Sequence, residues 1–144
     1  MGLDMYLSAK KYLWSFNDGD TQVAKEIQEK INVNRRVKEV VIEAAYWRKA
    51  NQIHSWFVDN VQDGIDECQP HHVSREQLQK LLNACRIAID RKDKSLLPPQ
   101  EGFFFGSTEI NDDYWHDIRR TAAEIETLFA ELDDTWEFEY CASW

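Results

Sequence analysis

The chain has 144 residues, a length that predicts one domain over residues 1–144 and a core that needs neither disulfides nor a structural metal. Seventeen Lys and Arg residues face 26 Asp and Glu residues, and the net charge of −9 argues against direct binding to nucleic acid or an anionic membrane. The six Trp, seven Phe and five Tyr residues exceed what such a core hides, so some rings are expected at a pocket or in a homo-oligomer interface.

The cysteine content and the first residues predict a cytoplasmic protein. Cys68, Cys85 and Cys141 are odd in number and widely spaced, which favours reduced thiols over a disulfide framework. The start, Met1–Leu7, lacks a basic residue and a sustained apolar run, so we expect no secretory signal. No stretch of the sequence approaches the length of a membrane-spanning helix.

The first part of the chain predicts two strands with a short helix between them. Leu3–Ser8 alternates apolar and polar residues, as a half-buried strand does. The turn-forming run Asn17–Asp20 follows, and Asp20 or Thr21 is expected to cap the helix. The apolar positions of that helix, four residues apart, are Val23, Ile27 and Ile31. Val37–Ala45 is rich in β-branched residues and predicts the second strand.

Two helices are predicted in the middle of the chain. The first covers roughly Tyr46–Val61, and a polar loop then runs to His72. Ser74 stands three residues before Gln77, a capping box that opens a second helix reaching about Asp90. The expected inward positions of the two helices are Ala50, Ile53, Phe57, Val61, Leu78, Leu81, Leu82, Cys85 and Ile89.

The last part predicts a loop, a helix and a strand. The prolines of Leu97–Gly102 exclude a helix there, and Phe103–Gly106 is a short extended run or tight loop. Asn111 or Asp112 is expected to cap the last helix, and the alternating run Thr135–Cys141 predicts the last strand. Together these elements predict an α+β fold, a small, mainly antiparallel sheet with about four helices packed on one face.

The strongest candidate for a binding site lies in the first half of the Tyr46–Val61 helix. Helical spacing puts Trp47, Asn51 and His54 on one stripe, with Arg48 beside them at the helix start. A Trp ring can stack on a planar ligand, and Arg can bind phosphate with two parallel hydrogen bonds. The structural alternative is that Trp47 belongs to the core, Arg48 forms a surface ion pair and His54 is half-buried.

A second candidate is the segment Glu101–Thr108, in which two glycines bracket three phenylalanines. Phe104 could stack on a base, and the hydroxyl and backbone of Ser107 could bind phosphate. The Lys and glycine spacing of a nucleotide-binding P-loop is absent from the segment. A loop packed by its own phenylalanines is the structural alternative.

Catalytic and metal-binding patterns are weak. Cys68, His71 and His72 lack a fourth ligand at zinc-site spacing, and Cys85 falls on an apolar helical stripe typical of a core. The sequence lacks a nucleophile elbow, a zinc-protease helix and a dinucleotide fingerprint. We therefore assign no catalytic residue, metal or cofactor, and the sequence favours a protein without enzymatic activity over an enzyme.

Carboxylates near the end of the chain raise the possibility of an inhibitor that imitates DNA phosphates. These residues are Glu131, Asp133, Asp134, Glu137 and Glu139. Most such runs are solvated surfaces that keep a protein soluble, and basic residues are interspersed elsewhere.

Four blocks of the sequence resemble a family of small phage and prophage proteins. The blocks are Met1–Leu7, Tyr46–His54 with the following Trp56–Phe57, Glu101–Ser107 and Tyr140–Trp144. They span nearly the whole chain in the family's order. The family's usual ending is Tyr-x-Ser-Ser-Trp, and Ala142 stands here in place of one serine, which puts a shared role for that hydroxyl in doubt.

The resemblance implies an origin in a phage and a place in the cytoplasm of its bacterial host. Small phage accessory proteins often trap nucleotide signals of host defence or block a defence protein. The four blocks are expected to meet at one end of the sheet, where Trp144 either anchors the C-terminus in the core or closes a pocket.

The leading hypothesis is a non-enzymatic protein that binds a small nucleotide-like ligand. The expected ligand-binding residues are Trp47, Arg48, Asn51, His54, Phe104, Ser107 and Trp144. One alternative is an acidic inhibitor of a host defence or nucleic-acid-binding protein. A second alternative is a hydrolase of such a ligand that depends on His54.

Overall fold

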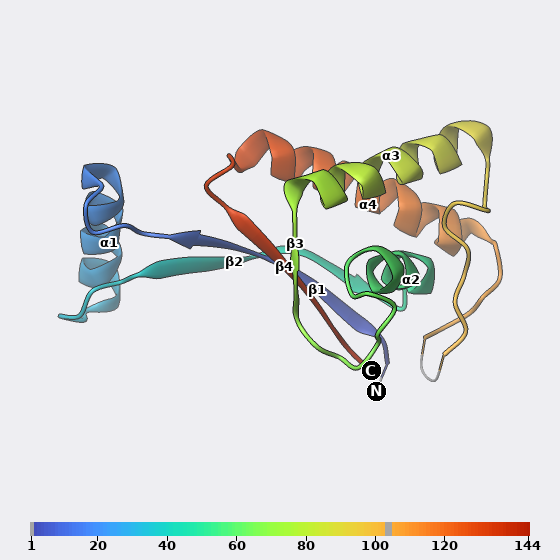
Figure 1. Cartoon of the computed structure of the whole chain (residues 1–144), viewed down its shortest axis with the longest axis horizontal. Helices are drawn as coiled ribbons and strands as arrows, with labels where there is room; N and C mark the ends of the chain where they lie inside the picture. The colour runs from blue at the N-terminus through green and yellow to red at the C-terminus, as the bar shows by residue number, and fades with distance from the viewer. Residues whose placement is uncertain (1, 103–104) are drawn as a thin grey trace.

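The computed structural model describes residues 2–102 and 105–144, which fold around one antiparallel sheet (Figure 1). In chain order its elements are β1 (Asp4–Tyr12), α1 (Asp18–Ile31), β2 (Glu39–Arg48), α2 (Asn51–Asn60), β3 (His71–Val73), α3 (Arg75–Arg91), α4 (Asp112–Glu131) and β4 (Glu137–Ser143). The strand order is β2-β1-β4-β3, and every neighbouring pair is antiparallel. The predicted α+β class is confirmed.

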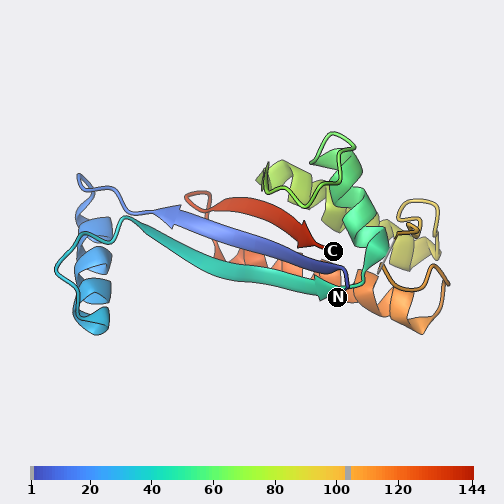
Figure 2. The same ribbon diagram turned by 90° about the horizontal axis from the view of Figure 1, so that it is seen from below.

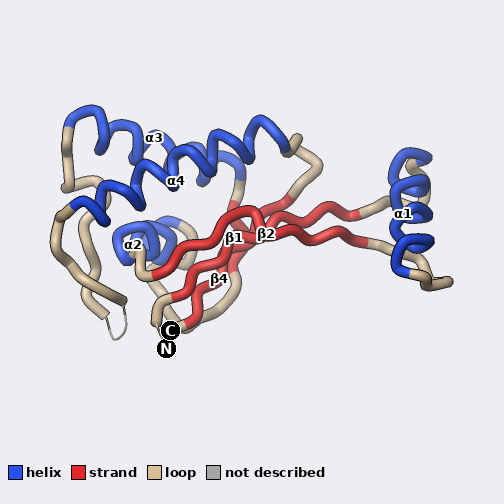
Figure 3. Tube along the Cα trace, turned by 180° about the vertical axis from the view of Figure 1, so that it is seen from behind, coloured by secondary structure: helices blue, strands red, loops and turns tan. Residues whose placement is uncertain are grey.

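One face of the sheet carries the core. From Leu3, just before β1, alternate side chains are buried at Leu3, Met5, Leu7 and Ala9, while Tyr6 on the opposite face is 39% exposed. The buried face is covered by α2, α3 and α4, as the view from behind shows (Figure 3). The alternation that predicted the first strand thus identifies the covered face of the sheet.

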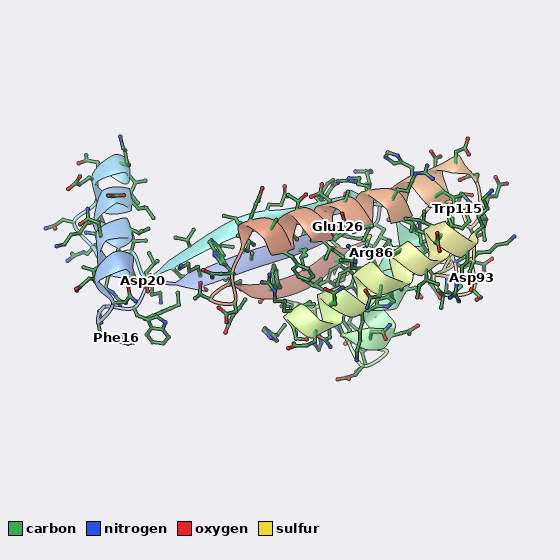
Figure 4. The ribbon with its side chains drawn as sticks, turned by 90° about the horizontal axis from the view of Figure 1, so that it is seen from above. Phe16, Asp20, Arg86, Asp93, Trp115 and Glu126 are labelled. Carbon is green, nitrogen blue, oxygen red and sulfur yellow. The ribbon has the colours of Figure 1, made fainter. Side chains whose placement is uncertain are left out.

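Helices α3 and α4 pack against each other over the sheet. The predicted capping box of α3 is present, with Ser74 accepting from the Gln77 backbone and Gln77 from the Ser74 backbone. Asn111 caps α4 as expected, and Cys85 is fully buried between the helices. An exposed ion pair, Arg86–Glu126 at 2.9 Å, also links the two helices (Figure 4).

Helix α1 departs from the predicted arrangement. β1 pairs with β4 only as far as Lys10, whereas its pairing with β2 continues to Tyr12, so the two strands run on beyond the rest of the sheet. Helix α1 lies at the far end of this extension instead of on the covered face (Figures 1 and 2). Its N-cap is Asn17 and not Asp20 or Thr21, because the helix already begins at Asp18 and the Asn17 side chain accepts from the Asp20 backbone.

Two further segments differ from the prediction. The expected polar loop before Ser74 contains β3, whose His71 and His72 pair with Tyr140 and Glu139 of β4. The predicted helix from Tyr46 was wrong in its first turn, because β2 continues through Arg48 opposite β1. Short apolar runs favour strand and helix almost equally, and here the pairing partner decides.

As a result Trp47 is a core residue. It lies opposite Met5 on β1, and its side chain is 1% exposed. Its indole Nε1 donates to Thr121 Oγ1 at 2.9 Å, and its ring centroid is 6.0 Å from that of Phe57. A ring enclosed in this way has no free face for a ligand, so the prediction that Trp47 binds the ligand was wrong.

We expect Trp47→Phe to lower the free energy of unfolding by about 2–3 kcal/mol, through a small cavity and the lost bond to Thr121. Urea unfolding followed by circular dichroism measures this value. The matched control is Trp14→Phe, because Trp14 is 52% exposed and its replacement should change stability by less than about 0.5 kcal/mol. An equally small effect at both positions would contradict the assignment of Trp47 to the core.

Candidate functional site

The predicted meeting of the four blocks at one end of the sheet is confirmed. The Lys49 backbone N–H, just before α2, donates to Leu3 O at 2.7 Å. On the other side, the rings of Phe105 and Trp144 meet edge to face with centroids 5.9 Å apart. The two chain ends lie together beside this region (Figures 1 and 2). Segments that are far apart in the sequence therefore lie together at one end of the sheet.

Asn51, at the start of α2, forms hydrogen bonds with backbone groups of Gln100, Phe105 and Ser107. Its Nδ2 donates to Phe105 O at 3.1 Å and Ser107 O at 2.9 Å, and its Oδ1 accepts from Gln100 N at 3.0 Å. The side chain is 2% exposed, so the amide is occupied by the loop. Asn51 therefore shapes the site and has little capacity left for a ligand.

His54 is the centre of a second hydrogen-bond network. Its side chain is fully buried, with Nδ1 2.7 Å from the Tyr140 hydroxyl and Nε2 2.9 Å from Asp66 Oδ2. Asp66 Oδ1 in turn accepts from Trp144 Nε1 at 3.0 Å. The chain of bonds thus leads from the core to the C-terminal residue.

The proton positions in this network follow from chemistry. Burial, with a smaller effect of the Asp66 charge, raises the pKa of Tyr140 well above its ordinary value of 10. The Tyr140 hydroxyl therefore keeps its proton. The Asp66 carboxylate can only accept, so His54 Nε2 carries a proton, and with a neutral ring the Tyr140 hydroxyl donates to Nδ1. Both ring nitrogens are hydrogen-bonded within the protein, so His54 has a structural role in this conformation.

One pocket lies between the end of β2 and the start of α4, and we call it the loop pocket. Its volume is about 310 Å³. It is lined by Arg48, Lys49, Asn51, Gln52, Gly106, Ser107, Glu109, Asn111, Asp113, Tyr114, His116 and Asp117. Three of the predicted ligand-binding residues, Arg48, Asn51 and Ser107, are therefore brought together here.

The loop pocket has walls of opposite charge. Arg48 and Lys49 are exposed on one side, and Arg48 makes only a loose ion pair with Asp4, at 3.4 Å. Carboxylates line the other side, among them Asp117, whose pKa is raised above its ordinary value chiefly by burial. Such a pocket can bind an anionic group at one end and hydrogen-bond donors at the other.

Gly106 keeps the loop close to Lys49. Its φ of +91° lies in a region that residues with a side chain rarely adopt, and an added Cβ would lie 3.0 Å from Lys49 Cβ. The backbone conformation and the close approach to Lys49 thus explain why a glycine stands at position 106 of the Glu101–Ser107 block. It allows the backbone to form the pocket wall.

The second pocket, which we call the terminal pocket, lies on the other side of the loop. Its volume is about 370 Å³. It is lined by His54, Ser55, Val58, Asp59, Gly64, Asp66, Gln100, Glu101, Gly102, Phe105 and Trp144. None of these described residues is a Lys or Arg, so the terminal pocket is a poor site for phosphate. Trp144 both joins the hydrogen-bond network and borders this pocket, with 45% of its side chain exposed.

The remaining sequence candidates are placed as follows. Phe104, expected to stack on a base, lies outside the described residues. His71 and His72 belong to β3, and within residues 2–102 and 105–144 no group of three His, Cys, Asp or Glu side chains is placed to hold a metal ion. Sequence reasoning did not select Lys49 or Asp117, since single charged residues carry no signal until the fold places them.

The comparisons with known proteins return no relative. No protein-family model, curated protein or solved structure matches the chain. The resemblance to small phage proteins thus stays a prediction from the four blocks. No helix among the described residues is long and apolar enough to cross a membrane.

The hydrogen-bond network predicts a dependence of stability on pH. In the unfolded chain Tyr140 should ionise near pH 10, whereas in the folded chain it stays protonated, so the free energy of unfolding should fall as the pH rises above 10. In Tyr140→Phe this decline should be shallower, and stability at pH 7 should be about 1–2 kcal/mol lower because His54 Nδ1 loses its donor.

Urea unfolding between pH 7 and pH 11 measures both effects. The control is Tyr6→Phe, because Tyr6 is 39% exposed and contributes no buried hydroxyl. An unchanged slope above pH 10 in Tyr140→Phe would contradict the role given to its hydroxyl.

Proposed function

We propose that the chain is a non-enzymatic phage accessory protein that acts in the cytoplasm of the bacterial host. In this proposal it binds a small nucleotide-like ligand in the loop pocket and so antagonises defence signalling. The observation that carries the proposal is the convergence of Arg48, Ser107 and Asn51, far apart in the sequence, on one cavity. The resemblance of the four sequence blocks to small phage proteins supports the origin.

The phosphate of the ligand would lie at the cationic wall. The Arg48 guanidinium can form two parallel bonds to phosphate, and the Lys49 ammonium supplies a second charge. The Ser107 side chain is exposed, and its Oγ accepts from the Glu109 backbone at 3.0 Å. Among the described residues its hydroxyl proton has no acceptor, so it can be donated to an anion.

The opposite wall suits the rest of a nucleotide. Carboxylates at Glu109, Asp113 and Asp117 accept hydrogen bonds, and bases and ribose carry N–H and O–H donors. The volume of about 310 Å³ lies at the lower end of small-molecule sites, which favours one nucleotide unit over a large cofactor. The acidic wall also disfavours a ligand made of phosphate alone.

The test is native mass spectrometry of protein purified gently from bacteria, before and after denaturation, with the released molecule identified by its ultraviolet spectrum. We expect a nucleotide-like ligand with the wild-type chain and its loss in Arg48→Ala. Stability should not change, because Arg48 is exposed and surface ion pairs contribute little.

The matched control is Arg86→Ala, an equally exposed arginine in a surface ion pair on α3 that does not line the loop pocket. It should retain the ligand in full. Equal retention by both variants would remove Arg48 from the site. A clean apo mass, repeated with lysate from phage-infected cells, would count against a nucleotide-like ligand.

An acidic inhibitor of a host protein is the alternative, and the exposed carboxylates at the α4–β4 turn favour it. Asp133 is held by the Thr135 backbone and hydroxyl, which leaves Asp134 as the freer charge there. In this case Asp134→Lys should weaken the complex, while Arg48 should be dispensable. For the hydrolase alternative, no observation on the described residues favours His54 as a base, since both its nitrogens are engaged.

A further inference from the structure

The extension that carries α1 has a surface unlike the rest of the molecule. We call residues 11–42 the arm and the remainder the body (Figures 1 and 2). Of the 14 large apolar side chains that are exposed among the described residues, eight lie on the arm. They are Tyr12, Trp14, Phe16, Val23, Ile31, Val33, Val41 and Ile42. Such a concentration marks an interaction surface.

Three aromatic rings form a row at the base of α1. The ring centroids of Tyr12 and Trp14 are 4.5 Å apart, and Trp14 stacks on Phe16 at 5.4 Å. The exposed fraction rises along the row from 39% at Tyr12 to 80% at Phe16. Figure 4 shows Phe16 beside α1 and far from helices α3 and α4 of the body. The body therefore does not cover this row.

Most of the surface of helix α1 is also not covered by the body. Among its 14 residues only Ala24 is buried, whereas Val23 is 43% exposed and Ile31 is 58% exposed. Isolated helices of this length are marginal in water, and most helices in proteins are stabilised by packing an apolar face. The arm thus exposes the surface that would ordinarily stabilise it.

Charge is separated between the arm and the body. The last two residues of β1 and the two connections beside α1, together residues 11–17 and 32–38, form what we call the neck. The neck holds four cations and no carboxylate, so the rest of the chain carries 13 Lys and Arg residues against 26 Asp and Glu residues. Arg35 and Lys38 are exposed, and Arg36 lies over the Tyr12 ring. A basic, aromatic neck selects an acidic partner with apolar surface.

We propose that this partner is a second copy of the same chain, bound so that the neck of each copy faces the acidic α4–β4 turn of the other. This turn carries Glu131 and Asp134, both exposed, and lies at the end of the body nearest the arm (Figures 1 and 3). A two-fold arrangement around this place brings neck and turn together twice. The chain itself thus supplies both a basic and an acidic surface.

The size of the exposed surface fits a dimer. A fully buried aromatic side chain contributes about 150–250 Å², so the exposed parts of the three rings amount to roughly 300–400 Å². The five aliphatic side chains on the arm enlarge this area towards the roughly 800 Å² per partner of a standard interface. The arm therefore offers enough surface for a specific dimer.

Single-stranded nucleic acid is the competing occupant, because it also selects cations and aromatic rings. Two observations favour the second copy. The exposed valines and isoleucines of the arm would stay uncovered beside a nucleic acid, and the strongly acidic body would repel its backbone.

Sedimentation equilibrium of the full chain, at several salt concentrations, tests the proposal. We expect a dimer that weakens as salt rises, because the neck and the turn are exposed charges. Phe16→Asp should weaken it by at least roughly 30-fold, the loss typical of a central interface residue, without changing the circular dichroism spectrum. Ile87→Asp on α3, where Ile87 is 39% exposed, is the matched control and should leave the dimer intact.

A charge exchange tests the proposed pairing itself. The neck variant Arg35→Glu with Lys38→Glu should be monomeric, and so should the turn variant Glu131→Lys with Asp134→Lys. An equimolar mixture should form the heterodimer, since both contacts are then restored.

Three results would overturn the proposal. These are a wild-type chain that stays monomeric at high concentration, a dimer unaffected by Phe16→Asp, and a mixture of the two charge variants that stays monomeric. A labelled single-stranded oligonucleotide, followed by fluorescence anisotropy, covers the competing occupant. Its binding to a monomeric wild-type chain, lost in Phe16→Asp, would assign the arm to nucleic acid.

Discussion

At the end of the sheet where the loop pocket and the terminal pocket lie, three buried polar side chains in the first turn of α2 hold the neighbouring segments in place. Because a buried polar group without a partner is costly, each must find hydrogen bonds, and each finds them on a different segment. Asn51 binds the backbone of Phe105 and Ser107. Gln52 donates to Tyr114 O on α4 at 3.1 Å, and His54 joins Tyr140 on β4 to Asp66. One helical turn thus fixes the relative positions of the loop, α4 and β4.

This arrangement separates the residues that build the site from those free to bind. Asn51 and His54 have their hydrogen-bonding groups occupied, and Trp47 is enclosed in the core. Arg48 and Ser107 remain exposed at a wall whose backbone those buried groups hold in place. Binding sites gain precision when their supporting residues are locked in this way. The loop pocket therefore combines free charged groups with a rigid frame.

The sequence predicted more of the fold than of the chemistry. Alternation along β1 and the capping box at Ser74 are local signals, and both were right. The helical stripe from Trp47 to His54 was wrong, because pairing with β1, a long-range contact, keeps residue 47 in a strand. The meeting of the four blocks was predicted, but whether a polar residue is buried or free depends on neighbours distant in sequence. The arm was not predicted, because the sequence alone does not show that the rest of the chain leaves residues 11–42 uncovered.

The arm and the pockets lie at opposite ends of the molecule, since the loop pocket adjoins the start of α2 and α1 lies beyond the far end of β1 and β2 (Figure 1). An interface made by the arm would therefore leave the cationic wall at Arg48 open. The charge distribution leads to the same division. The whole excess of carboxylates lies on the body, where the phosphate of the proposed ligand would depend on the local field of Arg48 and Lys49. The basic neck, by contrast, could contact an acidic partner without entering the pocket. Because distant surfaces without shared contacts contribute independently, the proposed self-association and the proposed ligand binding should respond to different substitutions.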